Sequence, residues 1–241
     1  MELAEPRAKS AQSAMADIID VATHEFAEKG LDGARVDLIA EAMRTSKRMI
    51  YYYFGGKEGL YLRVLEEAYR RARDIEARLQ LEDLAPEEAL AKLVAFTVDY
   101  QLANPDFIRL VMSENMQRGA YVARSKVIKV LNAPAIRALR SVCERGVAAG
   151  VFRADVDPID LHASISALSF FNVANRHTFA LIFDPDTATA AGTATRRDNI
   201  VEMVLRYVRS WPTETQTDVT QMNHPVSPSP CYGVGSDAAQ Q

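Results

Sequence analysis

The sequence predicts an all-α fold. Apolar residues recur at spacings of three and four through successive segments, which is the period of amphipathic helices. Gly, Pro, Ser and Asp residues separate these segments where helices begin and end. The strict two-residue alternation of a half-buried strand is not found along the chain. With 48% apolar residues, the chain can bury a substantial core, so we expect packed helices joined by turns.

Three helices are expected at the N-terminal end. The first covers residues 11–29, stops at Gly30 and follows a flexible N-terminus at residues 1–10. A short second helix covers residues 36–43. The third begins after Ser46, whose hydroxyl can accept from a free backbone N–H, and ends at Gly55 and Gly56. Because two short helices flank a tight turn, this region is expected to form a helix-turn-helix.

The third helix carries a local concentration of cations and tyrosines. Between Ala42 and Gly56 the sequence has no acidic residue, although the whole chain has a formal net charge of −4. Its cations and rings are Arg44, Lys47, Arg48, Tyr51, Tyr52 and Tyr53, followed by Lys57. Arg and Lys can contact guanine O6 and N7 in the major groove, while Tyr and Ser hold phosphates. A basic patch on an acidic protein predicts contact with DNA at one defined place.

These residues also carry a resemblance to a known family. FAEKGLDGARVDLIAEAM followed by SKRMIYYYFGGKEGL resembles the DNA-binding domain of TetR-family transcriptional regulators, with its aromatic-rich recognition helix followed by Lys-Glu. The resemblance covers residues 14–65 and implies a DNA-binding domain at 11–56 and a homodimer on double-stranded operator DNA. Two departures are Arg44, where relatives commonly have Gly, and Arg48, where many have a small residue. The first predicts a turn that is either strained or shifted, and the second an unusual operator preference.

The pattern and the resemblance together predict a set of DNA-binding residues. The set is Arg35, Val36, Thr45, Ser46, Lys47, Arg48, Met49, Tyr51, Tyr52 and Lys57. Ser46, Tyr51, Tyr52 and Lys57 are expected to contact phosphates, and Lys47, Arg48 and Met49 to read bases.

A helical effector-binding and dimerisation domain is expected over residues 57–211. Its first helix, residues 57–81, connects it to the DNA-binding domain, with an apolar face that ends in Ile75 and Leu79. Further helices are expected at residues 87–103, 106–117, 125–149, 158–183 and 194–211. Pro134 predicts a kink or break near Asn132. Residues 212–241 are expected to be a disordered tail.

The last two long helices, residues 158–183 and 194–211, are expected to form the homodimer interface, unless their apolar faces only fill the core. Asn172 and Asn175 interrupt an apolar face, which predicts either an effector pocket or hydrogen bonds across the dimer. The expected small-molecule effector residues are Phe107, Met112, Asn115, Met116, Phe171, Asn172, Asn175 and His177. Glu114 is expected to pair with an arginine such as Arg118 or to be exposed.

The segment NPDFIRLVMSEN and the Phe-Phe-Asn sequence resemble the subgroup of TetR regulators that control pyrimidine or nicotinate catabolism. This resemblance implies a small aromatic or heterocyclic effector. We expect a repressor of nearby genes that its effector releases from DNA. The sequence does not identify the effector, the operator, the regulated genes or the sign of regulation, so an activator of the same fold stays open.

Enzymatic and metal-binding functions are not expected. His24, His162, His177 and His224 are far apart in the sequence, and Cys143 and Cys231 form no zinc motif. We therefore expect no catalytic residues, no cofactor, no metal and no membrane partner, in a cytoplasmic protein. The competing hypothesis is a helical scaffold whose basic patch binds an acidic protein.

Overall fold

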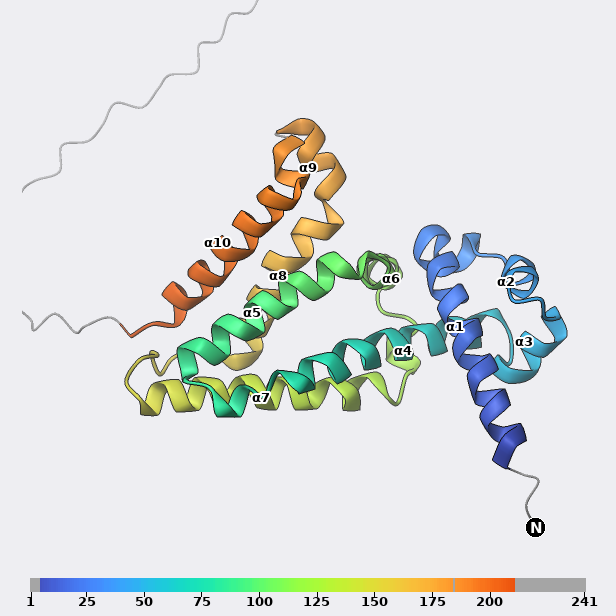
Figure 1. Cartoon of the computed structure of the whole chain (residues 1–241), viewed down its shortest axis with the longest axis horizontal. Coiled ribbons are helices and arrows are strands. Elements are labelled where there is room, and N and C mark those ends of the chain that lie inside the picture. The colour runs from blue at the N-terminus through green and yellow to red at the C-terminus, as the bar shows by residue number, and fades with distance from the viewer. Residues whose placement is uncertain (1–4, 184, 211–241) are drawn as a thin grey trace, which may run out of the picture. The chain divides into compact units, whose positions relative to one another are not determined.

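The computed structural model describes residues 5–183 and 185–210, with side chains from residue 12 onward, so the predicted tail at 212–241 lies outside it. The described chain is helical, apart from one antiparallel bridge between Phe152 and Arg209 (Figure 1). The all-α prediction is therefore confirmed. None of the described helices is long and apolar enough to cross a bilayer.

The N-terminal domain contains α1 (Glu5–Gly33), α2 (Val36–Ala42) and α3 (Lys47–Phe54). The first helix starts at Glu5, earlier than the expected residue 11 and within the segment expected to be flexible. Gly30 adopts φ 65° and ψ 178°, which interrupts the helical geometry at the predicted stop. The three helices enclose an apolar core that includes Ile18, Ile19, Ala22, Phe26, Ile39, Ile50 and Phe54.

The connecting helix α4 covers Lys57–Glu76 and is shorter than the expected 57–81. Two 3₁₀ turns follow it, η1 (Ala77–Leu79) and η2 (Leu81–Asp83), with Gln80 between them at φ 52°. This left-handed residue ends η1 and lets Leu81 enter the C-terminal core. The expected inward face is wrong at Ile75, which is 43% exposed, whereas Leu79 packs against the C-terminal core as expected.

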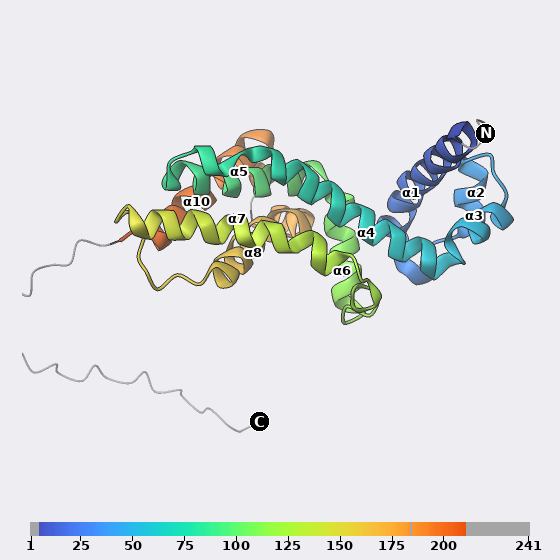
Figure 2. The ribbon, with the colours of Figure 1, turned by 90° about the horizontal axis from the view of Figure 1, so that it is seen from below.

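The C-terminal domain contains α5 (Pro86–Ala103), α6 (Pro105–Met116), η3 (Val122–Arg124), α7 (Ile128–Ala148), α8 (Pro158–Ala174), α9 (Arg176–Ile182), η4 (Pro185–Ala188) and α10 (Ala190–Val208). Its core lies mainly between α5, α7, α8 and α10 and includes Leu90, Val94, Val98, Leu139, Val142, Phe152, Leu161, Ile165, Ile200 and Val204. Figure 2 shows α4 and α7 side by side, so the connecting helix is packed along the body of this domain.

Two expected helix boundaries in this domain are wrong. Residues 158–183 form two helices, because Asn175 (φ −107°, ψ 5°) leaves the helical conformation between α8 and α9. The last helix starts at Ala190 instead of 194, where the Thr189 hydroxyl accepts from Gly192 N–H at 3.1 Å.

The helix break expected near Asn132 does not occur, because α7 is continuous through Pro134. Pro134 and Val130 are both exposed, so solvent can satisfy the Val130 carbonyl that loses its donor. The Asn132 amide donates to the Ile128 carbonyl at 2.8 Å within the same helix.

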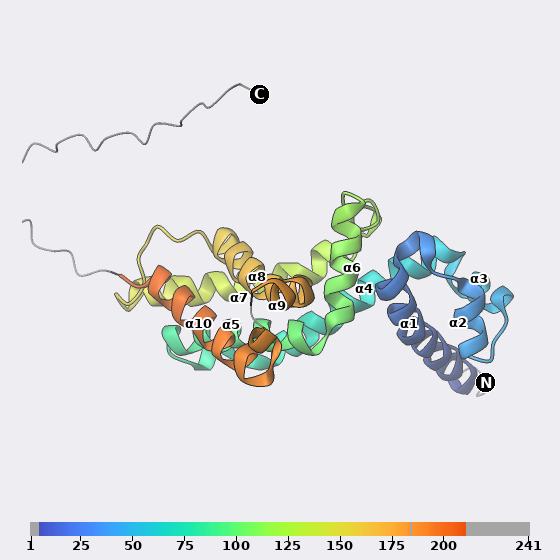
Figure 3. The ribbon, with the colours of Figure 1, turned by 90° about the horizontal axis from the view of Figure 1, so that it is seen from above.

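The N-terminal core continues into the second domain. Leu110 of α6 and Ile128 of α7 belong to the same apolar cluster as Phe26 and Ile50. Figure 3 shows α6 beside α1, and these two helices are in contact. The DNA-binding domain therefore packs against the body of the protein through side chains of α4, α6 and α7.

Glu114 helps to fix this junction, contrary to both expectations for it. Its side chain is buried, and Oε2 accepts from the backbone N–H groups of Tyr121 and Val122 at 3.1 and 3.0 Å. This holds the connector between α6 and α7, whose Tyr121 ring lies 5.2 Å from that of Tyr61 on α4. Burial raises the pKa of Tyr61 to about 12.

Candidate nucleic-acid interface and effector region

The turn before α3 and the start of this helix are set by local chemistry. Arg44 adopts φ 50°, the left-handed conformation that the comparison with glycine-bearing relatives predicted. Ser46 is extended (φ −98°, ψ 147°), and its Oγ accepts from Met49 N–H at 3.3 Å, as predicted. Gly55 (φ 74°) ends the helix, and its backbone N–H donates a hydrogen bond to the Tyr51 carbonyl oxygen.

The helix α3 separates an inward from an outward face. Ile50 and Phe54 are buried, and Tyr53 packs against the same core. The residues exposed on the outward side are Lys47, Arg48, Met49, Tyr51 and Tyr52, and the Tyr52 side chain is 79% exposed. Lys47 Nζ lies 5.9 Å from the centre of the Tyr51 ring. The structure thus brings together five of the expected DNA-binding residues on one surface.

Three other expected DNA-binding residues are less available to DNA, two because they have protein partners and one because it is buried. Arg35 Nη2 lies 2.5 Å from Asp37 Oδ2, and this hydrogen bond keeps the pKa of Asp37 below its usual value. Lys57 Nζ donates to the Asp32 carbonyl at 3.0 Å. Val36 is only 4% exposed, so its side chain cannot reach DNA and any contact would have to use its backbone N–H.

The end of α3 is held closely against the beginning of α4. A Cβ added to Gly59 would overlap the Phe54 carbonyl oxygen, so only glycine fits at this contact. The position of the outward face therefore depends on the position of α4.

The expected effector residues do not form one site, which corrects that prediction. Phe171 and Asn172 line a pocket, but Met112, Asn115, Met116, Asn175 and His177 do not line it. Met116 is 84% exposed, and the Asn115 side-chain amide donates a hydrogen bond to the Val111 carbonyl. Because α8 ends before Asn175 and α6 packs against α1, these side chains point to different places. Phe107 instead packs between the rings of Tyr69 and Tyr100.

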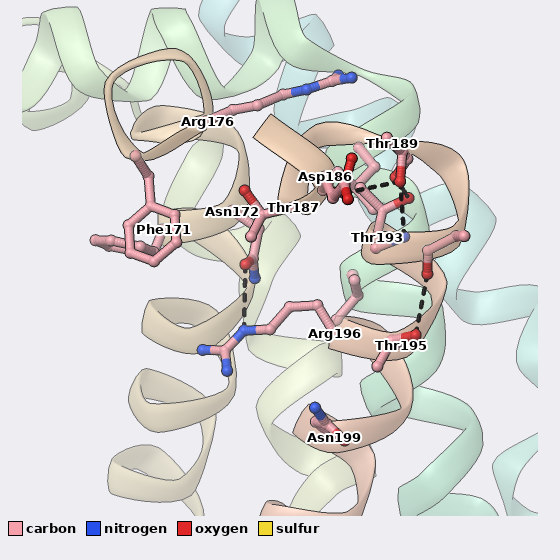
Figure 4. A pocket seen from close by; sticks show the side chains of 15 residues that line it. Phe171, Asn172, Arg176, Asp186, Thr187, Thr189, Thr193, Thr195, Arg196 and Asn199 are labelled. Carbon is pink, nitrogen blue, oxygen red and sulfur yellow. Dashed lines mark hydrogen bonds between the residues drawn. The ribbon is translucent and has the colours of Figure 1, made fainter. Parts of the chain in front are cut away.

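The pocket that contains Asn172 has a volume of about 800 Å³ and lies between α5, α8, α9, η4 and α10. Figure 4 shows the Asn172 carbonyl accepting from Arg196 Nε, at 3.3 Å. The Asn172 amide donates to the Leu168 carbonyl at 2.6 Å, and Arg176 Nη2 donates to the Ala188 carbonyl at 2.9 Å. The main polar groups of this pocket thus have partners within the protein.

A buried polar cluster on α4, α5 and α8 was not predicted. Arg73 Nη1 lies 2.5 Å from Glu76 Oε2, and their side chains are 20% and 10% exposed. The charge of Arg73 also acts on Tyr69, Tyr100 and His162. Burial raises the pKa of Glu76 and lowers that of His162. The spacing of Tyr69, Arg73 and Glu76 on one helix face was the available signal for this cluster.

A second polar cluster joins α1 to α6. Arg109 forms ion pairs with Glu28 and Asp106, and His24 Nδ1 lies 3.1 Å from Asp106 Oδ2. Ligand atoms of His24, Glu28 and Asp106 lie within 4.8 Å of one another. Because Arg109 already pairs with both carboxylates, we interpret this cluster as a link between the two domains.

The sequence matches two family models. Residues 18–64 match the model of bacterial regulatory proteins of the tetR family, and residues 86–204 match the tetracyclin repressor-like C-terminal domain. The HTH-type transcriptional repressor NicS of Pseudomonas putida KT2440 is 34% identical over 203 residues, covering 84% of this chain and 96% of NicS. RutR of Escherichia coli K12, an HTH-type transcriptional regulator, is 30% identical over 45% of this chain and 50% of RutR.

The fold also matches solved structures. SCO4942 from Streptomyces coelicolor superimposes with a TM-score of 0.60 and 26% identity, over 80% of this chain and 97% of that protein. The match with NicS over nearly its whole length, the two family models and the helix-turn-helix geometry lead to one assignment. The chain belongs to the TetR family of DNA-binding transcriptional regulators and is not an enzyme.

Proposed function

We propose that this protein is a repressor that binds operator DNA as a homodimer and is released by a small-molecule effector. The observation that supports the proposal most directly is the outward face of α3. It exposes Lys47, Arg48, Tyr51 and Tyr52 on a helix whose opposite face is buried. Such a rigid support is what base recognition needs, because a recognition helix must enter the major groove in a fixed orientation.

The DNA-binding roles follow from exposure and chemistry. Lys47, Arg48 and Met49 lie in the first turn of α3, where they can read base edges. Ser46, Thr45, Tyr51, Tyr52 and Lys57 contact phosphates, together with Arg35 and the backbone N–H of Val36. These contacts fix the orientation on the duplex without reading its sequence.

The experiment is a fluorescence-anisotropy titration of DNA from upstream of the protein's own gene, with a scrambled duplex of equal length as the control. A repressor should bind the upstream DNA at least about 10³-fold more tightly. A scaffold for acidic proteins would bind both duplexes equally and weakly, and salt would abolish the binding. A reporter gene under the same promoter then distinguishes repression from activation.

We place the dimer interface on α8 and α10, with α9 beside it. Large apolar side chains are exposed on these three helices: Ile159, Phe171, Leu181, Ile182, Phe183, Met203 and Tyr207. Exposed apolar side chains of this number are typical of a surface that a second copy covers. Light scattering should give a dimer for the wild type and a monomer for Met203→Glu/Ile159→Glu. The variant should keep its helical circular dichroism, because both side chains point outward.

The release mechanism is a difference in affinity between two conformations. The effector binds more tightly to the one in which the two recognition helices no longer match the operator spacing. The helix α4 begins beside α3 and packs along α7 of the C-terminal domain, and α6 contacts α1 through Arg109. These two connections can carry a change in the C-terminal domain to the DNA-binding domain.

A further inference from the structure

Arg73 is a buried cation whose hydrogen-bonding capacity is not used. Its Nε and Nη1 atoms are covered and, within the described part of the chain, make no hydrogen bond. Glu76 Oε2 lies 2.5 Å from Nη1, but the pair lacks hydrogen-bond geometry. A covered donor without an acceptor costs about 1–3 kcal/mol, and more when it is charged. An acceptor that reaches the guanidinium therefore gains this free energy.

Aromatic rings line the region beside this guanidinium. The Phe107 ring lies 5.4 Å from that of Tyr69 and 6.1 Å from that of Tyr100, and Tyr100 lies 5.7 Å from Phe96. Tyr69 lies one helical turn before Arg73 on α4, and the Arg73 charge opposes the rise in the pKa of Tyr69 and Tyr100 that burial causes. The region contains one cation next to a continuous group of rings from α4, α5 and α6.

The other ionisable groups beside Arg73 favour an anionic ligand. Burial raises the pKa of Glu76 and, together with the Arg73 charge, lowers the pKa of His162. Burial opposes a charge on His162, so the guanidinium, next to its ion-pair partner Glu76, is the cation that a ligand meets. The Arg73 side chain keeps 20% of its surface exposed, although its Nε and Nη1 atoms are covered.

We propose that Arg73 anchors the effector and that the effector is a small aromatic carboxylate. Its carboxylate accepts hydrogen bonds from the guanidinium, and its ring packs among Tyr69, Tyr100 and Phe107. This inference rests on the proposed function, since it names the chemical class of the ligand that releases the operator.

The pocket of Figure 4 does not offer the same recognition. Its Arg196 and Arg176 donate to the Asn172 side chain and the Ala188 carbonyl. Each of those guanidinium groups thus has a hydrogen-bond acceptor already, whereas Nε of Arg73 has none within the described residues. The carboxylate would also compete with Glu76 for the guanidinium near the C-terminal end of α4. A shift of this helix reaches α3 through the contact at Gly59.

Isothermal titration calorimetry on the full-length dimer tests this proposal with benzoate and pyridine-3-carboxylate, and with the neutral controls benzamide and pyridine-3-carboxamide. We expect at least one carboxylate to bind, and its amide to bind about 10- to 100-fold more weakly, the loss expected for charge-assisted hydrogen bonds. Arg73→Gln should weaken carboxylate binding by the same factor. Arg70→Gln is the matched control, because Arg70 is on the same helix but pairs with Glu67.

Arg73→Gln leaves Glu76 buried without its partner, so Arg73→Gln/Glu76→Gln is the second variant, from which the whole pair is removed. It should fold and still not bind the carboxylate. Operator binding without ligand is measured on every variant. The proposal is overturned if neither carboxylate binds, if amide and carboxylate bind equally, or if both Arg73 variants bind as the wild type does. Intact operator binding in these cases leaves the regulatory function standing.

Discussion

Lys57 Nζ donates a hydrogen bond to the carbonyl oxygen of Asp32 at 3.0 Å, which joins the first turn of α4 to the C-terminal end of α1. This side chain therefore has two functions in our proposal. It stabilises the helix-turn-helix, and its charge lies where the helix N-terminus also favours a phosphate.

Lys57→Met should weaken binding to every DNA sequence and reduce the slope of log affinity against log salt by about one unit. It should also lower the free energy of unfolding by about 0.5–1.5 kcal/mol, because the hydrogen bond to Asp32 is lost. Anisotropy titrations at several salt concentrations and urea unfolding measure the two effects. Lys126→Met, at an exposed lysine of the C-terminal domain, should change neither. A loss confined to the specific operator would contradict this role.

Arg48→Ala should relax the preference for one base pair of each half-site. The expected cost on the preferred operator is about 1–3 kcal/mol, the value of a good bidentate contact to a base. Competition titrations with a set of single-base operator variants would locate that position, and binding to random DNA should change far less. A uniform loss on all these duplexes would instead assign Arg48 to the phosphates.

Arg44→Gly should raise the free energy of unfolding, because the left-handed turn is relieved. It should also lower DNA affinity, because the basic patch loses one of its cations. The left-handed conformation costs a non-glycine residue about 1–2 kcal/mol, of which the added freedom of an unfolded glycine cancels about half. The net gain in urea unfolding should be about 0.5–1 kcal/mol. Gln80→Gly is the matched control, because Gln80 is also left-handed (φ 52°) but lies far along the chain from α3. The Gln80→Gly variant should gain stability and leave DNA binding unchanged. A fall in its DNA affinity would show that the relief of a left-handed residue, and not the lost charge, weakens binding in Arg44→Gly.

Loss of the ion pairs between α1 and α6 should weaken communication between the two domains. Arg109→Met removes the pairs with Glu28 and Asp106. Operator affinity without ligand should stay within about twofold of the wild-type value. The ratio of operator affinity without ligand to that with the tightest-binding carboxylate should fall by about two- to tenfold. Arg206→Met, which breaks an exposed pair with Glu202 on α10, is the control. Unchanged release in Arg109→Met would show that α4 alone carries the signal.

His162 should make the protein less stable as the pH falls. Burial and the charge of Arg73 lower its pKa below the usual value of 6.5, so the unfolded chain takes up the proton first. The penalty is absent well above pH 6.5 and grows as the pH falls below it. Urea unfolding at a series of pH values should therefore show a smaller loss for His162→Gln than for the wild type. His177→Gln, at an exposed histidine, should behave as the wild type does.

Local chemistry made the recognition helix predictable. Ser46 and Gly55 act on backbone groups within four residues of themselves, so their capping roles can be inferred without knowledge of the rest of the fold. The division between α8 and α9 could not be inferred, because the apolar period continues past Asn175. Arg73 was missed for a related reason. Charged residues are usually exposed, and only the packing of α5 and α8 over α4 covers this one.

Leu110 and Ile128, two side chains of the body, complete the core of the DNA-binding domain. If the chain were cut at residue 56, the core of the isolated DNA-binding domain would lack these two side chains. The domain should therefore not be exchangeable between regulators as an independent unit. A hybrid that carries the DNA-binding domain of another regulator would need residues at positions 110 and 128 that fit the core of that domain. Substitutions that alter operator preference by changing the core of this domain should therefore evolve together with substitutions at Leu110 and Ile128.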